Sequence, residues 1–150
     1  GTGSVSVEMA LRADQGQVFA VEKKDDAVAL LYKNKQRFAA DNLEIIKGEA
    51  PEALKELPVP THAFIGGSSG NLKEIVALLL EKNRDVRIVI NCITLETISE
   101  ALEILKEYDF ADQEAVQLTA SRSKEIGKYH LMMGENPIYI ITCQSPRAQI

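Results

Sequence analysis

Two kinds of apolar pattern alternate along the chain. Short continuous apolar runs predict buried β-strands, and apolar residues that recur every three or four positions predict amphipathic helices. The strand-like runs cover residues 17–22, 43–46, 62–65 and 87–91. The helix-like segments cover residues 4–11, 25–38, 51–57, 72–80 and 95–108. This alternation is typical of a parallel sheet with crossover helices, so the predicted fold class is α/β with a doubly wound, Rossmann-like sheet.

Two of the predicted helices have a clear apolar face. Val28, Leu31 and Phe38 fall on one face of the second helix, which Asp25 or Asp26 can cap. The helix at 72–80 is strongly amphipathic. Its predicted inward residues are Leu72, Ile75, Val76, Leu79 and Leu80.

The rhythm changes near the C-terminus. Residues 115–120 and 138–142 are two strand-like runs with no helix between them. Such a pair predicts an antiparallel hairpin at the sheet edge. The polar stretch 121–136 that joins the two runs is predicted to be a long connection, and connections of that length are often functional.

Length and charge limit the class of protein. The 150 residues suit one compact core, so residues 1–150 are predicted to form a single domain. The formal net charge of −5 disfavours a nucleic-acid partner, because nucleic-acid binders neutralise phosphates with surplus Lys and Arg. No apolar stretch approaches the roughly 20 residues that cross a membrane, so no membrane partner is expected.

The two cysteines carry little chemical information. Cys92 and Cys143 lie inside the apolar runs IVINC and IYIITC, without metal-ligand spacing. They are therefore predicted to be reduced, buried thiols of a cytoplasmic protein rather than catalytic groups. No other residues form a metal-ligating cluster, so no metal site is predicted.

Two elements favour a nucleotide-like cofactor. Gly1, Thr2 and Gly3 directly precede a predicted helix, where a glycine backbone can approach a ligand and the helix N-terminus favours polar groups. Glu22 ends the next strand about 20 residues on, where doubly wound folds place an acid on the ribose hydroxyls. The alternatives are a plain turn for the first element and a solvated acid for the second. Together they favour an adenosyl cofactor.

The identity of the cofactor depends on position 6. A dinucleotide fingerprint needs glycine there, and this chain has Ser6, which disfavours NAD. A methyltransferase needs no glycine at that place. Its doubly wound sheet also has one reversed strand near the edge, which agrees with the predicted C-terminal hairpin.

Five segments then carry a specific resemblance. In order they are GTGSVSVE (1–8), GEAPEAL (48–54), FIGGSSGNL (64–72), RIVINCITLET (87–97) and NPIYIIT (136–142). They resemble the decarboxylating precorrin-6Y and cobalt-precorrin-6B methyltransferase family over essentially the whole chain. The resemblance implies an S-adenosylmethionine-dependent enzyme of cobalamin biosynthesis. Such an enzyme methylates ring carbon 15, or carbons 5 and 15, and decarboxylates an acetate side chain.

The resemblance also implies the cofactor residues. The first loop would line the methionine and ribose, Glu22 would hold the ribose hydroxyls, and Glu49 and Ala50 would lie against the adenine. Glu49 as a helix cap and Gly66–Gly67 as a tight turn remain alternatives. The implied cofactor residues are Gly1, Thr2, Gly3, Glu22, Glu49, Ala50 and Gly66.

A tetrapyrrole edged with carboxylates requires local positive charge on an acidic protein. Residues 121–130 supply four basic groups against the single acid Glu125. A solvated loop is the alternative, and His130 is either a proton-transfer group or an ordinary loop residue. Tyr129 and the pair Met132–Met133 pack either on the macrocycle or in the core. The predicted substrate residues are Gly67, Ser68, Arg122, Lys124, Lys128 and His130.

The chain also departs from the family pattern. An acidic strand and a further glycine are expected before Gly1, and that strand is expected at the centre of the sheet. A chain without it should fold poorly or bind its cofactor weakly. The family domain occurs alone or fused behind a second precorrin methyltransferase domain, and its members are expected to form homo-oligomers, with a tetramer as the expected state.

Three other functions remain open at this point. Another methyltransferase of the same fold would bind the cofactor and ignore precorrins. An NAD-binding oxidoreductase is disfavoured by Ser6. A non-catalytic interaction domain would have lost its cofactor. No nucleophile–base pair is apparent, and methyl transfer to an electron-rich ring needs chiefly orientation and water exclusion.

Overall fold

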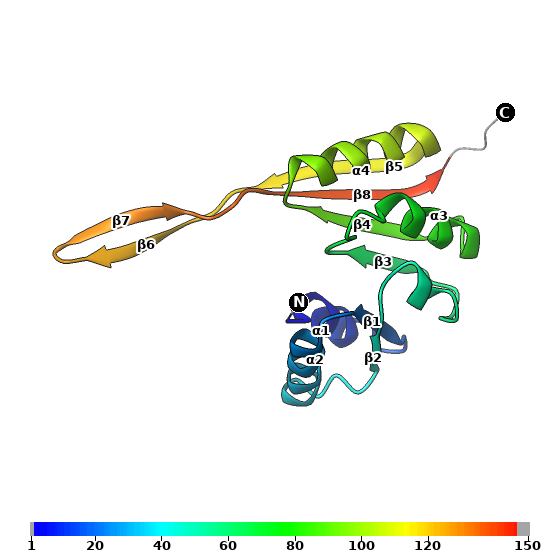
Figure 1. The fold of residues 1–150 in the computed structure, drawn as a ribbon, viewed down its shortest axis with the longest axis horizontal. Coiled ribbons are helices and arrows are strands. Elements are labelled where there is room, and N and C mark those ends of the chain that lie inside the picture. Colours follow the sequence, from blue (N-terminus) through cyan, green and yellow to red (C-terminus); the bar gives the residue numbers. More distant parts are fainter. Residues whose placement is uncertain (1, 147–150) are drawn as a thin grey trace. The chain divides into compact units, whose positions relative to one another are not determined.

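The computed structural model describes residues 2–146, which fall into two compact units, Gly1–Pro58 and Val59–Ile150. Each unit is described by itself, and the single domain over 1–150 stays a prediction. The first unit contains α1 (Ser4–Arg12), β1 (Val18–Glu22), α2 (Asp25–Arg37), β2 (Leu43–Lys47) and the 3₁₀ turn η1 (Glu52–Leu54). The second unit contains β3 (His62–Ile65), α3 (Leu72–Lys82), β4 (Arg87–Cys92), α4 (Leu95–Tyr108), β5 (Phe110–Leu118), β6 (Ser121–Ile126), β7 (Tyr129–Gly134) and β8 (Ile138–Pro146) (Figure 1).

The first unit is a parallel strand pair with its helices. β1 and β2 run parallel in the register Val18↔Leu43 to Glu22↔Lys47. Apolar residues from α1, β1, α2 and β2 form one core. The apolar faces that the sequence predicts are buried in this core, away from water. The buried residues of this core are Val7, Ala10, Val18, Ala20, Leu31, Ala40 and Leu43.

Gly3 is required at the start of α1. It is the N-cap residue and has a φ of +74°, in the left-handed region that other L-residues rarely adopt. A Cβ at this position would lie 2.0 Å from Cδ2 of Leu31. Both backbone conformation and packing against α2 therefore exclude a larger residue.

Three local predictions in this unit are wrong. Phe38 is 47% exposed because α2 ends at Arg37 and Phe38 is its C-cap residue. Asp25 and Asp26 do not cap α2. They lie in its first turn after Lys24, where the positive end of the helix dipole stabilises their negative charges. The helix predicted at 51–57 is only the short turn η1.

The second unit has a mixed four-stranded sheet in the order β3-β4-β8-β5. β3 and β4 are parallel, and β8 runs antiparallel to both β4 and β5. The predicted antiparallel pair is therefore confirmed, although β5 begins at Phe110 rather than near residue 115. A Rossmann-like α/β arrangement with one reversed strand agrees with the predicted fold class.

One face of this sheet is buried. Ile88, Ile90 and Cys92 on β4 and Ile141 and Cys143 on β8 are almost fully buried. α4 packs on this sheet and also contacts α3. The inward face predicted for α3 is confirmed at Leu72, Ile75, Val76 and Leu79, and Leu80 is half-buried.

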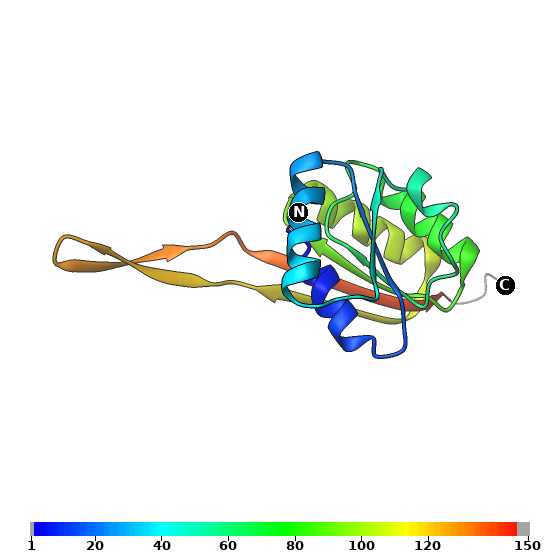
Figure 2. The same cartoon turned by 90° about the horizontal axis from the view of Figure 1, so that it is seen from below.

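The polar stretch predicted as an irregular connection is instead a second hairpin. β6 and β7 pair antiparallel from Ser121↔Gly134 to Ile126↔Tyr129 and are joined by Gly127 and Lys128. Gly127 has a φ of +62°, as the first residue of a type II′ turn requires. All twelve strand residues of this hairpin are exposed. Two views show the ribbon projecting beyond β5 and β8 (Figures 1 and 2).

A bulge separates this ribbon from the sheet. The β5–β8 pairing ends at Leu118↔Ile138, and the β6–β7 pairing resumes at Ser121↔Gly134. Residues 135–137 on one strand therefore oppose residues 119–120 on the other. Such a bulge increases local twist, and Pro137 fits there because it has no N–H to donate to a ladder.

The longest helix in the described part of the chain, α4, has 14 residues. None of these helices is long and apolar enough to span a bilayer, which needs about 20 residues.

Candidate functional site

The predicted cofactor residues of the first unit lie at the carboxyl ends of its strands. Glu22 is the last residue of β1, and Glu49 and Ala50 follow β2. Because β1 and β2 are parallel, these ends share one edge of the sheet, where α/β proteins bind their ligands. Nζ of Lys23 forms an ion pair with Oε1 of Glu49 at 2.7 Å, which joins the two strand ends.

The Glu22 carboxylate is held by the backbone. Its Oε1 accepts hydrogen bonds from the N–H groups of Lys23 at 2.9 Å and Lys24 at 3.0 Å. Its own carbonyl oxygen accepts a bond from the Gly48 N–H at 3.1 Å. A carboxylate offers about four acceptor sites, so this fixed group can also accept hydrogen bonds from vicinal hydroxyls.

A pocket of about 710 Å³ lies against the residues that follow Glu22. Thr2 lines it together with the residues that follow Glu22, and the Thr2 carbonyl oxygen accepts a 2.8 Å bond from Nδ2 of Asn34. The loop before α1 and the turn after β1 therefore line one pocket. Gly1 lies outside the described residues. The lining residues are Thr2, Lys23, Lys24, Asp25, Asp26, Ala27 and Leu30.

The second unit places the glycine loop at the same kind of edge. Gly66, Gly67 and Ser68 directly follow β3, beside the carboxyl end of the parallel strand β4. A Cβ on Gly67 would meet nothing within 4 Å, so packing within the chain does not require glycine there. At the end of the loop, the Ser68 carbonyl oxygen accepts a 2.9 Å hydrogen bond from the backbone N–H of Asn71, the residue before α3.

The basic hairpin leaves from this edge as well. β8 is antiparallel to β4 with Tyr139 opposite Cys92, so its first residue, Ile138, lies at the carboxyl end of β4. β6 and β7 connect the end of β5 to the start of β8. The glycine loop and the basic hairpin predicted to bind substrate therefore share one edge of the four-stranded sheet (Figure 1).

The pairing register divides the predicted basic residues between two faces of the hairpin. Arg122 is opposite Met133 and Lys124 is opposite Leu131, and cross-strand partners lie on the same face. This apolar-basic face also contains the pair Ile126–Tyr129. Its residues are Arg122, Lys124, Ile126, Tyr129, Leu131 and Met133.

His130 lies on the other face, opposite Glu125. Lys128 is in the turn, where its Nζ is 5.6 Å from the centroid of the Tyr129 ring. Nε of Arg122 pairs with Glu135 at 3.3 Å, and both side chains are well exposed. The four basic residues therefore do not form one cluster, and two of them share a face with apolar side chains.

Ile126 and Leu131 were not among the residues that sequence reasoning selected. A weaker signal was present, because Gly127-Lys128 is a two-residue segment of the kind that joins the strands of a hairpin. Charge drew attention to the segment, but only the register shows which side chains share a face.

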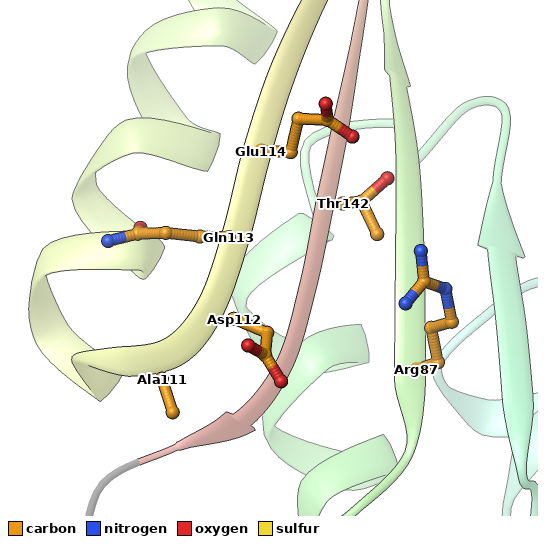
Figure 3. Close-up of a pocket in the computed structure, with 6 residues that line it drawn as sticks. All are labelled: Arg87, Ala111, Asp112, Gln113, Glu114 and Thr142. Carbon is orange, nitrogen blue, oxygen red and sulfur yellow. The ribbon is translucent and has the colours of Figure 1, made fainter.

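A smaller pocket of about 350 Å³ lies at the opposite edge of the sheet. Arg87, the first residue of β4, lines it with Thr142 and Glu114 on β8 and β5 (Figure 3). This pocket is at the amino end of β4, away from the glycine loop. It therefore does not belong to the candidate site.

Both cysteines are buried, as predicted, and neither is in a disulfide. Burial raises the pKa of the Cys143 thiol to about 11 and also raises the pKa of Cys92. A thiol with a raised pKa is a poor nucleophile at neutral pH. Within residues 2–146, no three side chains of the metal-ligating types come together.

Fold and site together define a class. A Rossmann-like sheet with a reversed strand, and an acid fixed at the end of β1, are the features of an α/β methyltransferase. A model of the precorrin methyltransferase domain matches residues 1–144. The chain belongs to the precorrin methyltransferase family.

Relatives of known sequence agree. The Salmonella typhimurium cobalt-precorrin-6B C(15)-methyltransferase (decarboxylating) is 35% identical over 145 residues, which are 96% of this chain and 74% of that protein. A protein of Pyrobaculum calidifontis that provisionally carries the same name is 39% identical over 144 residues, 95% of this chain and 73% of its own length.

A solved structure, the precorrin-6y C5,15-methyltransferase of Geobacter metallireducens, has a TM-score of 0.86 and 32% identity. The aligned part covers 96% of this chain and 76% of that one. The predicted family, fold class and enzyme class are therefore confirmed. The roles of individual residues stay predictions.

Proposed function

We propose that this protein binds S-adenosylmethionine and methylates carbon 15 of a precorrin, and that it also promotes loss of carbon dioxide from an acetate side chain. The observation that carries the proposal is family membership over residues 1–144. The strand-end acid, the glycine loop and the basic hairpin support it, since they supply a cofactor side and a polyanion side.

On the cofactor side, S-adenosylmethionine supplies a methyl group on a positively charged sulfur. Glu22 accepts hydrogen bonds from the ribose hydroxyls, and its two backbone hydrogen bonds orient it for this task. Thr2 and Gly3 approach the methionine and ribose part with their backbone. Glu49 and Ala50 lie against the adenine. Gly66 is the remaining proposed cofactor contact.

On the substrate side, Gly67 and Ser68 border the macrocycle, which approaches closely because Gly67 has no side chain. Arg122, Lys124 and Lys128 pair with the carboxylates of the tetrapyrrole. His130, on the opposite face of the hairpin, is the fourth proposed substrate contact in this segment. Positive charge at this edge also raises the local concentration of an anionic substrate around a chain with a net charge of −5.

The decarboxylation step uses the substrate as its own electron acceptor. The bond between the acetate methylene and its carboxylate carbon breaks, carbon dioxide leaves, and the electron pair enters the conjugated ring. The ring is protonated in a later step, and this proton balances the electron pair that the ring received. The protein holds the ring, excludes water and places charge around it.

We also propose that the protein acts in the cytoplasm as a homo-oligomer, with a tetramer as the expected state. The exposed hairpin supports self-association, because an isolated two-stranded ribbon is only marginally stable in water. A second precorrin methyltransferase domain, fused or separate, would catalyse transfer of a methyl group from S-adenosylmethionine to carbon 5. Neither nucleic acid nor a membrane is expected as a partner.

Calorimetric titration with S-adenosylhomocysteine tests the cofactor site. Glu22→Gln should weaken binding by about ten- to a hundredfold, since it removes charge-assisted hydrogen bonds. Glu44→Gln is the matched control, because Glu44 is an exposed glutamate on β2 that bonds Gln17. Equal affinities for wild type and Glu22→Gln would reject the assigned site.

A further inference from the structure

Asn91 has an unusual environment. Its carboxamide oxygen Oδ1 is closed to solvent and has no hydrogen-bond partner among residues 2–146. Buried polar oxygens in native proteins are nearly always hydrogen-bonded, because an unpaired one destabilises the fold. Such an acceptor is available to a water molecule, an ion or a donor group of a bound ligand.

The position of Asn91 points to that partner. It is the penultimate residue of β4, at the carboxyl edge where the glycine loop and the hairpin begin. Its neighbours Ile90 and Cys92 face the buried side of the sheet, so Asn91 points to the opposite face. Ile140 of β8 is directly opposite in the register and offers no polar group.

Phe64 lies on the same sheet face as Asn91, because it is opposite Val89, two residues before Asn91 on β4. The β3–β4 register ends at Ile65↔Ile90, one residue before both Gly66 and Asn91. A Cβ on Gly66 would lie 3.0 Å from Cε1 of Phe64, so the Phe64 ring leans along β3 to this level. That ring is only half-buried, and Gly66 beside it is exposed.

We propose that Asn91 is a substrate-contacting residue whose oxygen accepts a hydrogen bond from an N–H group of the tetrapyrrole ring. This inference rests on the proposed function. A carboxamide oxygen only accepts, and a ring N–H only donates, so the two are complementary. In a ring that holds cobalt, the metal has replaced the inner N–H protons. Asn91 therefore favours the metal-free substrate over the cobalt-bound one.

The test measures tetrapyrrole binding by absorbance, with full-length enzyme saturated with S-adenosylhomocysteine. The probes are metal-free precorrin-6B and cobalt-precorrin-6B. Asn91→Leu should weaken binding of the metal-free ring by about tenfold or more, because an unpaired donor is then left in the complex. It should change binding of the cobalt form by no more than about twofold and leave the Kd of S-adenosylhomocysteine unchanged.

Stability separates this role from a structural one. Asn91→Leu removes an unpaired buried oxygen at similar volume, so its melting temperature should equal or exceed that of wild type. Thr142→Val is the matched control, a half-buried polar residue on the same sheet face that is opposite Val89. It should bind both probes like wild type. Asn91→Ser provides a second variant with the same expected loss if Asn91→Leu folds poorly.

The outcomes are distinct. If wild type binds neither tetrapyrrole, the proposed function fails. If wild type binds the metal-free ring and Asn91→Leu binds it equally well, only the Asn91 inference fails. Binding of the cobalt form alone by wild type would also overturn the inference.

Discussion

At the scale of residues, three side chains show how local environment determines role. Glu22 is fixed by two backbone N–H groups, so it is ready to accept hydrogen bonds from a ligand. Gly3 is held against Leu31 at a positive φ, so its identity follows from packing as well as from any ligand. Cys143 is fully buried, which removes it from nucleophilic chemistry.

Gly3→Ala should destabilise the protein by about 2–4 kcal/mol, from the left-handed backbone and the clash with Leu31. Urea unfolding followed by circular dichroism measures this free energy. Gly134→Ala is the control, because a Cβ there meets nothing within 4 Å, and its change should stay within about 0.5 kcal/mol. A loss at position 3 no larger than at position 134 would contradict the described packing.

The Cys143 thiol should make stability depend on alkaline pH. In the unfolded chain its pKa takes the ordinary value of 9.0, whereas burial raises the folded value to about 11. Between these values the unfolded state loses its proton first, so the free energy of unfolding falls as pH rises. The stability advantage of wild type over Cys143→Ala should therefore shrink between pH 8 and pH 10.5. An advantage that stays constant would show that the thiol is not buried.

At the scale of elements, the β6–β7 hairpin is the feature that most needs a partner. It projects from the carboxyl edge of β4, and one face carries Arg122 and Lys124 beside four apolar side chains. A flat, apolar ring edged with carboxylates matches such a mixed face. The opposite face, with Glu125 and His130, lacks this combination.

Reversal of charge on this face should weaken binding of the substrate and leave binding of the cofactor unchanged. Arg122→Glu combined with Lys124→Glu should raise the KM for the precorrin by about tenfold or more, with little change in the Kd of S-adenosylhomocysteine. Lys106→Glu, at an exposed position of α4, alters charge elsewhere and should have no such effect. An unchanged KM in the double variant would remove the hairpin from the substrate site.

At the scale of the whole molecule, periodicity predicts most elements because buried strands and amphipathic helices repeat their apolar residues. The bounds of β3 and α4 match the prediction, and the predicted inward face of α3 is buried. Periodicity did not predict the β6–β7 hairpin, because SRSKEI has a single apolar residue, Ile126, and its strand residues are exposed rather than buried. The prediction that Phe38 is buried was wrong because periodicity does not show the residue at which a helix ends.

Prediction of the candidate site required information other than apolar periodicity. Position at the end of a strand, about 20 residues after a glycine loop, selects Glu22. The roles of Gly66, Gly67 and Ser68 came from family resemblance. The roles of Glu49 and Ala50 came from family resemblance. Asn91 could not be selected from sequence, because its importance lies in a missing hydrogen-bond partner that only packing reveals.

Self-association is the remaining prediction at this scale. Leu131→Asp with Met133→Asp places two charges on the apolar-basic face and should reduce the mass of the assembly, because buried unpaired charges disfavour association. Light scattering after size-exclusion chromatography measures this mass. An unchanged oligomer would locate the interface elsewhere, and a monomeric wild type would reject the oligomer altogether.

The most direct test of the central claim is product analysis by mass spectrometry. Full-length enzyme is incubated with precorrin-6B or cobalt-precorrin-6B and with S-adenosylmethionine labelled at its methyl carbon. We expect one product that has gained a labelled methyl group at carbon 15 and lost carbon dioxide, with no product from heat-denatured enzyme. Unchanged tetrapyrrole with folded, cofactor-bound enzyme would contradict the assignment of substrate and reaction.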